Sequence, residues 1–168
     1  STGELTDEKI LLALFANQIL EGIYFYAGFA ALYALGKSGK MLGSSQIIRF
    51  IQRDEITHLL LFQNMIYSVI KERPDLFTKE LEEKVRTMYQ RAVELESGWG
   101  KYITGNRILG ISDKTIEMFI QSLANQAFSK IGEPELYEGV KNPFVWFNDW
   151  LDFNATNERF FEGTVMNY

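Results

Sequence analysis

The chain has 168 residues, the length of one ordinary domain. It is 46% hydrophobic and 23% charged with a net charge of −5, which is typical of a globular protein and gives no basis for a nucleic-acid partner or an anionic membrane surface. The absence of cysteine excludes disulfides, thiolate metal sites and thiol nucleophiles, and is compatible with the reducing cytosol.

The longest apolar stretch, residues 19–35, contains Glu21 and two glycines and is rich in tyrosine. A buried helix that carries one acid explains this composition better than a membrane span does. No segment has the features of a signal or transit peptide. We therefore expect a cytoplasmic protein with no membrane segment.

The first predicted helix begins after Thr6 or Asp7, whose side chains can cap it. Its apolar pattern continues to about Leu35, and Gly36 and Gly39 are expected to end it. We therefore predict one continuous helix over this whole segment.

The second predicted helix is capped by Ser44 or Ser45 and runs to about Arg73, where Pro74 prevents its continuation. The third follows Thr78 and ends near residue 105.

Ser112 is expected to cap a fourth helix that ends at Gly132. Loops and short turns are expected over residues 133–157, the aromatic run 142–147 should pack against the helices, and a last short helix is expected to begin near Asn157. No useful stretch alternates with period two, so residues 1–168 are predicted to form a single all-α domain, a helical bundle.

Glu21 lies among apolar and aromatic residues on every face of its helix, which predicts a buried carboxylate. A buried carboxylate requires a partner or a shifted pKa. That partner can be a metal cation, or it can be Arg49 or Arg53 of the next helix.

Glu55 and His58 are three residues apart, so both side chains can reach one ion from the same helix face. The apolar run at residues 59–62 places the pair in the predicted core. Di-iron carboxylate bundles use a Glu from each of two helices and Glu-x-x-His from each of two others, and this chain has one of each. Carboxylate and imidazole ligands suit iron or manganese. Glu-x-x-His also occurs by chance, and His58 as a core imidazole bonded to the backbone is the other interpretation.

Residues 20–29 and 47–58 closely resemble the second half of class I ribonucleotide reductase small subunits. In that family a Leu-Glu followed by an aromatic segment precedes Arg-Asp-Glu-x-x-His, and Glu21 and Glu55 keep the family's spacing. Asn-Pro-Phe at 142–144, the tryptophan-rich segment after it, Thr-Asn at 156–157 and Phe-Phe-Glu at 160–162 are also similar. The resemblance covers residues 10–168 and implies a partial ferritin-like bundle, formed by its second half plus the C-terminal helices.

The resemblance implies that Glu21, Glu55 and His58 are ligands of a di-metal centre, which holds two iron ions or manganese. It further implies that three residues, Phe25, Phe29 and Ile51, form the apolar pocket around a tyrosyl radical. Asp54 matches the acid that links the metal-bound histidine of the other half to radical transfer, and it should point away from the metal.

In the family the remaining ligands and the radical tyrosine lie on earlier helices, and a tail that docks on the catalytic large subunit follows. We therefore expect a fragment, a split-gene product or a processed product. Its expected partners are the upstream half, a second small subunit in a homodimer, and the large subunit.

The implied activity is that of a ribonucleoside-diphosphate reductase small subunit, which activates dioxygen and generates a tyrosyl radical for deoxyribonucleotide synthesis. The alternatives are another ferritin-like di-metal oxidase or iron-binding protein, and a non-catalytic scaffold derived from the family.

Overall fold

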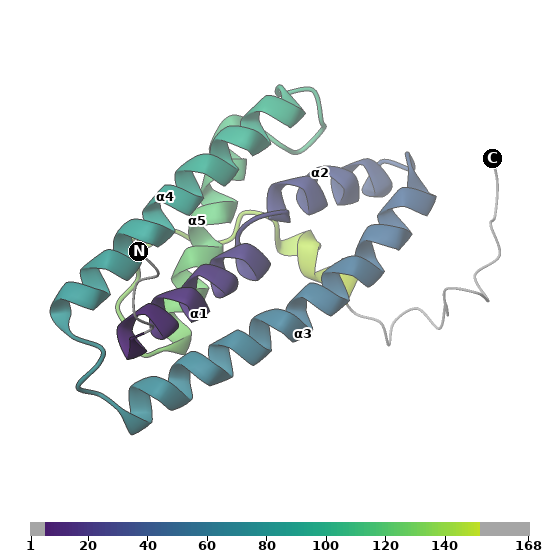
Figure 1. Cartoon of the computed structure of the whole chain (residues 1–168). Coiled ribbons are helices and arrows are strands. Elements are labelled where there is room, and N and C mark those ends of the chain that lie inside the picture. Colours follow the sequence, from purple (N-terminus) through teal and green to yellow (C-terminus); the bar gives the residue numbers. More distant parts are fainter. Residues whose placement is uncertain (1–5, 152–168) are drawn as a thin grey trace, which may run out of the picture.

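The structure, a computed structural model, describes residues 6–151, and this part of the chain is helical without a strand (Figure 1). The predicted all-α class is confirmed. In chain order the elements are α1 (Asp7–Gly22), α2 (Tyr26–Lys37), α3 (Leu42–Glu72), α4 (Lys79–Thr104), α5 (Asp113–Lys130) and the 3₁₀-helix η1 (Val145–Leu151). The helix expected near Asn157 and the Phe-Phe-Glu segment lie outside the described residues.

The helices pack in three groups, with α1 and α2 in the middle, and α3 is much less buried than the others. α1 and α2 follow one another, α3 returns alongside both, and α4 and α5 pack on the other side of α1 and α2 (Figure 1). The core between these elements is rich in fully buried aromatic side chains, including Phe15, Tyr33, Tyr89, Phe119 and Phe128. In contrast, α3 buries only Ser45, Gln52 and Ile66 of its 31 residues. One long face of α3 is therefore open in the described chain.

The prediction of a single helix from Thr6 to about Leu35 is wrong in one respect, because residues 23–25 interrupt the helix. α1 ends at Gly22, and α2 begins at Tyr26 after Phe25 adopts a left-handed conformation with φ 77°. A non-glycine residue rarely adopts this conformation, so the surrounding structure must hold it there. The break begins directly after Gly22, one residue beyond Glu21.

Three of the predicted caps are confirmed. The side chains of Thr6, Thr78 and Ser112 accept hydrogen bonds from backbone N–H groups in the first turns of α1, α4 and α5. The prediction for α3 is wrong: the helix begins at Leu42, and the buried Ser45 hydroxyl donates to Leu32 O at 2.8 Å. Ser45 therefore joins α3 to α2 instead of capping α3.

The aromatic run after residue 142 packs against the bundle, as expected. Phe144 and Phe147 are 1% and 3% exposed, and both rings contact Phe119 of α5. Trp150 stacks on Tyr33 of α2 with the ring centroids 4.9 Å apart. This segment closes the end of the core beside α2.

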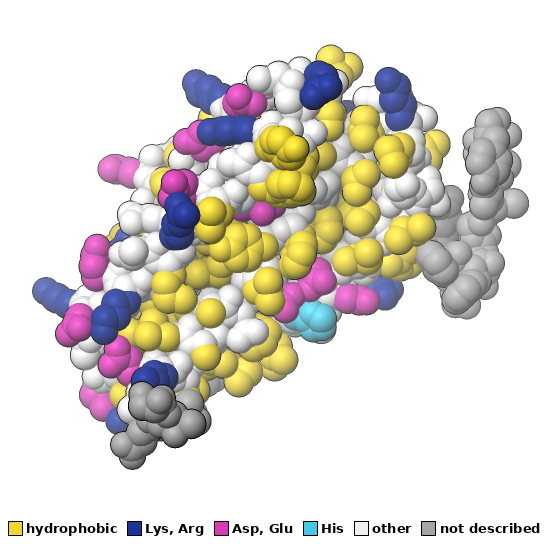
Figure 2. Space-filling view, turned by 45° about the horizontal axis from the view of Figure 1, so that its top comes forward, with side chains coloured by type: hydrophobic (Ala, Val, Ile, Leu, Met, Phe, Trp, Pro, Cys, Tyr) yellow, Lys and Arg dark blue, Asp and Glu magenta, His cyan; other side chains and the backbone are white. Residues whose placement is uncertain are grey.

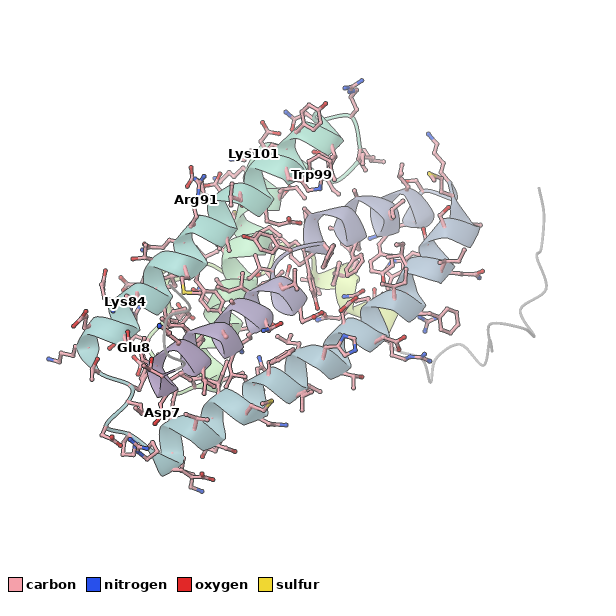
Figure 3. All side chains as sticks on the ribbon, in the orientation of Figure 1. Asp7, Glu8, Lys84, Arg91, Trp99 and Lys101 are labelled. Carbon is pink, nitrogen blue, oxygen red and sulfur yellow. The ribbon has the colours of Figure 1, made fainter. Side chains whose placement is uncertain are left out.

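Two ion pairs join the start of α1 to its neighbours. Glu8 lies 2.9 Å from Lys84 of α4, and Asp7 lies 3.4 Å from Arg73 at the end of α3 (Figure 3). These side chains are about half exposed, so solvent screens each pair and its contribution to stability is small. The fold is held mainly by its apolar core.

The segment Asp7–Lys37 is long and apolar enough by composition to cross a membrane, the one such segment among residues 6–151. Half of its most apolar window is buried against the other helices, and residues 23–25 interrupt it. Packing in the core of the bundle accounts for its apolar composition.

Candidate metal centre

Glu21, Glu55 and His58 converge at one point between α1 and α3. Nδ1 of His58 lies 3.2 Å from Oε2 of Glu55 and 3.6 Å from Oε2 of Glu21. One potential ligand atom from each residue lies within 4.8 Å of the others. The structure thus brings together the three residues that the sequence analysis selected as ligands.

Local helical geometry and one glycine account for this convergence. Glu55 and His58 are one turn apart on α3, so their side chains lie on the same face. Glu21 lies in the last turn of α1, next to Gly22. A Cβ atom at Gly22 would lie 2.8 Å from Cδ1 of Leu59, the end of a flexible side chain that would then have to move, so glycine at this position makes the close approach of α1 to α3 easier.

The electrostatics of the cluster favour a bound cation. A hydrogen bond with Glu55, together with burial, raises the pKa of Glu21 above its ordinary value. A hydrogen bond with Glu55 also raises the pKa of His58. The carboxylate of Glu55 disfavours a second negative charge on Glu21 and favours a positive charge on His58, so a cation between these side chains would be stabilised. Two carboxylates and one imidazole form a ligand set that fits iron or manganese.

The predicted interior location of this site is wrong for the described chain. The side chain of His58 is 53% exposed, and those of Glu21 and Glu55 are 16% and 20% exposed. Figure 2 shows the single histidine at the surface, with acidic side chains beside it and hydrophobic side chains around them. The reason is that the outer face of α3 is uncovered, which a pattern of apolar neighbours cannot reveal.

The exposed face of α3 carries a regular row that includes the histidine. This row, which we call the α3 stripe, consists of Ile47, Ile51, Asp54, His58, Leu61 and Met65, all exposed. Steps of four and three residues alternate along it, the spacing by which one helix packs on another. The candidate site therefore lies in the middle of a face with the pattern of a helix–helix interface.

Asp54 is not part of the cluster. It lies on the α3 stripe, and its carboxylate pairs with Arg53 at 3.1 Å, with both side chains more than half exposed. The guanidinium of Arg53 also lies over the ring of Phe50. In this arrangement the neighbours of Glu21 are His58 and Glu55, which favours the cation site over the alternative of an arginine partner.

The three residues expected to form the radical pocket have different environments. Phe29 is 6% exposed and contacts the ring of Tyr26, with centroids 5.4 Å apart. Phe25 and Ile51 are 49% and 43% exposed. Within the described chain they do not enclose one pocket, because two of them are open to solvent.

Two buried glutamines behind the site were missed by the sequence analysis. Gln18 and Gln52 are 1% and 0% exposed, and their amide oxygens accept hydrogen bonds from Tyr89 at 2.8 Å and Tyr33 at 2.5 Å. Both line a cavity of about 230 Å³ that Tyr26 also lines. Burial raises the pKa of Tyr26 to about 12, so its hydroxyl stays protonated. The sequence did contain a signal for their burial, because Gln18 of α1 and Gln52 of α3 are polar residues at core-facing helical positions.

A second buried acid, Glu96 of α4, was also missed. It is 4% exposed, and its Oε1 accepts a hydrogen bond from the backbone N–H of Ala27 at 3.0 Å. Burial raises its pKa above the ordinary value. Glu96 lies three and four residues after the buried Val93 and Ala92, so its position on the core-facing side of the helix was the available signal.

Comparison with known proteins identifies the family. The model of the family "Ribonucleotide reductase, small chain" matches residues 1–143. The chain belongs to the ribonucleotide reductase small-chain family. The ribonucleoside-diphosphate reductase subunit beta of Treponema pallidum is 38% identical over 98% of this chain and 49% of its own length. The corresponding subunit of Halalkalibacterium halodurans is 35% identical over 97% of this chain and 48% of its own length.

Solved structures of the family have the same fold. The ribonucleotide reductase R2 subunit from Clostridium botulinum superposes with a TM-score of 0.82 at 45% identity, covering 87% of this chain and 46% of that one. The ferritin-like fold expected from the sequence is confirmed by this similarity. The chain spans about half the length of the relatives it matches.

Proposed function

We propose that this chain is the C-terminal half of the small subunit of a ribonucleoside-diphosphate reductase and supplies three ligands of its di-metal centre. The observation that carries the proposal is the convergence of Glu21, Glu55 and His58 within 4.8 Å, in a chain of the small-chain family. A non-catalytic scaffold does not need two adjacent carboxylates, here Glu21 and Glu55, whose proximity raises the pKa of Glu21.

The three ligands would hold iron or manganese through two carboxylates and Nδ1 of His58, the ring nitrogen that faces both acids. When bound, two metal ions supply the redox chemistry that activates dioxygen and oxidises a tyrosine to a radical. The chain's own residues would bind the ions, and Phe25, Phe29 and Ile51 would keep water from the radical once the upstream half covers Phe25 and Ile51. Asp54 would orient a histidine of the upstream half for radical transfer.

The upstream half of the subunit is the proposed cover for the α3 stripe. Two more ligand helices complete the bundle pattern of two Glu and two Glu-x-x-His sets. They would bury the stripe, because its alternating spacing is that of helix–helix packing and its side chains are mostly apolar. Further proposed partners are a second small subunit, in a homodimer, and the catalytic large subunit. The proposed location of this assembly is the cytoplasm.

Metal analysis of the chain combined with the upstream half tests this function. The wild-type complex should bind about two iron or manganese ions, and H58A or E55A should lower the metal content to about one or fewer. The matched control is E72A, which removes an exposed acid from the end of the same helix. Metal content that is unchanged in H58A and E55A would contradict the proposal.

A further inference from the structure

The break between α1 and α2 depends on a residue from a different helix. In an unbroken helix the N–H of Ala27 would bond to the carbonyl of Ile23, four residues earlier. Here the N–H of Ala27 instead donates to Oε1 of Glu96 at 3.0 Å, and the carbonyl of Ile23 makes a long contact of 3.5 Å with the N–H of Tyr26. Glu96 therefore takes the place of a backbone acceptor that the break removes.

The start of α2 has no other side-chain cap. Its N-cap residue is Phe25, whose side chain makes no capping hydrogen bond. The N–H groups of a first helical turn need acceptors, and the helix dipole favours a carboxylate there. Glu96, 69 residues away in the sequence, supplies an acceptor for the N–H of Ala27, and this acceptor is a carboxyl group at the N-terminal end of the helix.

The contact between α4 and α2 leaves little room for another arrangement. Gly100 lies one turn after Glu96, and a Cβ atom there would lie 2.9 Å from Cβ of Ala27 and 2.7 Å from Cγ2 of Ile116. Trp99 and Lys101, labelled in Figure 3, mark this stretch of α4, which passes beside the start of α2. The backbone of α4 thus holds the carboxylate of Glu96 at the break.

We propose that Glu96 is a positioning residue for the metal centre. By capping α2 it maintains the break, which ends α1 at Gly22 and leaves Phe25 about half exposed. Glu21 is the residue before Gly22 and lies 3.6 Å from His58 of α3, so the place where α1 ends sets the place of this carboxylate. Glu96 contacts none of the three candidate ligands and acts through the backbone of residues 23–27. The consequence for metal binding rests on the proposed function, whereas the effect on the break and on Glu21 does not.

Three variants of this chain, each combined with the upstream half, test the proposal. E96L removes the acceptor, and E96Q retains a carbonyl oxygen at the same place. V93A is the matched control, because it shortens a side chain that is 3% exposed one turn before Glu96 and leaves the carboxylate in place. Isotope labelling of this chain alone makes His58 its single histidine signal, and that signal reports whether Glu21 and Glu55 remain beside the ring without any metal.

In E96L the Ala27 amide should exchange with solvent about tenfold faster, because a buried donor has lost its acceptor. The His58 signal should shift, and Mn²⁺ affinity should fall about tenfold, whereas E96Q should resemble wild type in all three measurements. V93A should lower thermal stability without these changes. Unchanged Ala27 exchange and an unchanged His58 signal in E96L would overturn the proposal. Failure of the wild-type complex to bind Mn²⁺ would instead contradict the proposed function.

Discussion

At the scale of single residues, His58 and Glu55 could be predicted as a pair, because their spacing alone puts them on one helix face. Glu21 could be chosen as an acid in an apolar segment, and family resemblance connected it to the pair. The exposure of His58 could not be predicted, since it depends on what covers α3. The spacing of Glu96 from the apolar residues one turn earlier could have indicated its burial, but its hydrogen bond to Ala27, far away in the sequence, could not be predicted.

Glu96 should make stability depend on pH. Burial raises its pKa in the folded chain above the ordinary value of 4.5, so the folded state holds this proton more tightly than the unfolded state does. The resulting stabilisation is complete below about pH 4.5 and is lost as the pH rises through the raised pKa. The free energy of unfolding of wild type should therefore fall relative to that of E96Q as the pH rises above about 4.5 and through the raised pKa of Glu96.

Urea unfolding of both proteins at several pH values measures this difference. A difference that stays constant with pH, or that moves in favour of wild type, would show that the charged carboxylate is better accommodated at the break than its burial implies.

At the scale of the helices, the confirmed caps are those made within one turn. Thr6, Thr78 and Ser112 each accept from a residue three positions later, so the sequence contains both partners. The two wrong predictions involve partners on other helices. Ser45 donates to α2, and Ala27 donates to α4. Local sequence signals therefore predicted helix existence well, but they missed the break between Gly22 and Tyr26.

Two glycines of α4 should respond oppositely to alanine. At Gly98 an added Cβ meets nothing within 4 Å, so G98A should raise the free energy of unfolding by up to about 1 kcal/mol through helix propensity. At Gly100 the added methyl would meet Ala27 and Ile116 closer than 3.0 Å, and neither contact atom is at the end of a flexible side chain. G100A should lower the free energy of unfolding by about 1–3 kcal/mol.

Thermal or urea denaturation of the two variants measures the contrast. Because both substitutions are on one helix and have the same intrinsic propensity, equal effects would show that α4 does not approach α2 as closely as described.

At the scale of the whole molecule, the open face of α3 dominates the behaviour of the chain. Four apolar side chains of the α3 stripe are exposed in a row, and Ile10 and Leu20 of α1 and Phe25 of the break are exposed as well. We predict that the isolated chain self-associates and binds a hydrophobic dye. Addition of the upstream half should abolish both effects, because its helices would cover the same face. Analytical ultracentrifugation with dye fluorescence checks this, and a dye-free monomer would indicate a self-contained domain.

Anomalous X-ray diffraction from crystals of the chain combined with the upstream half and loaded with iron or manganese tests the central claim most directly. The account predicts an anomalous peak about 2.0–2.3 Å from Nδ1 of His58 and from carboxylate oxygens of Glu21 and Glu55. Asp54 should lie beyond coordination distance, beside a histidine of the upstream half. A peak coordinated by Asp54, or no peak at the cluster while metal is bound elsewhere, would contradict the assignment of these three residues as ligands.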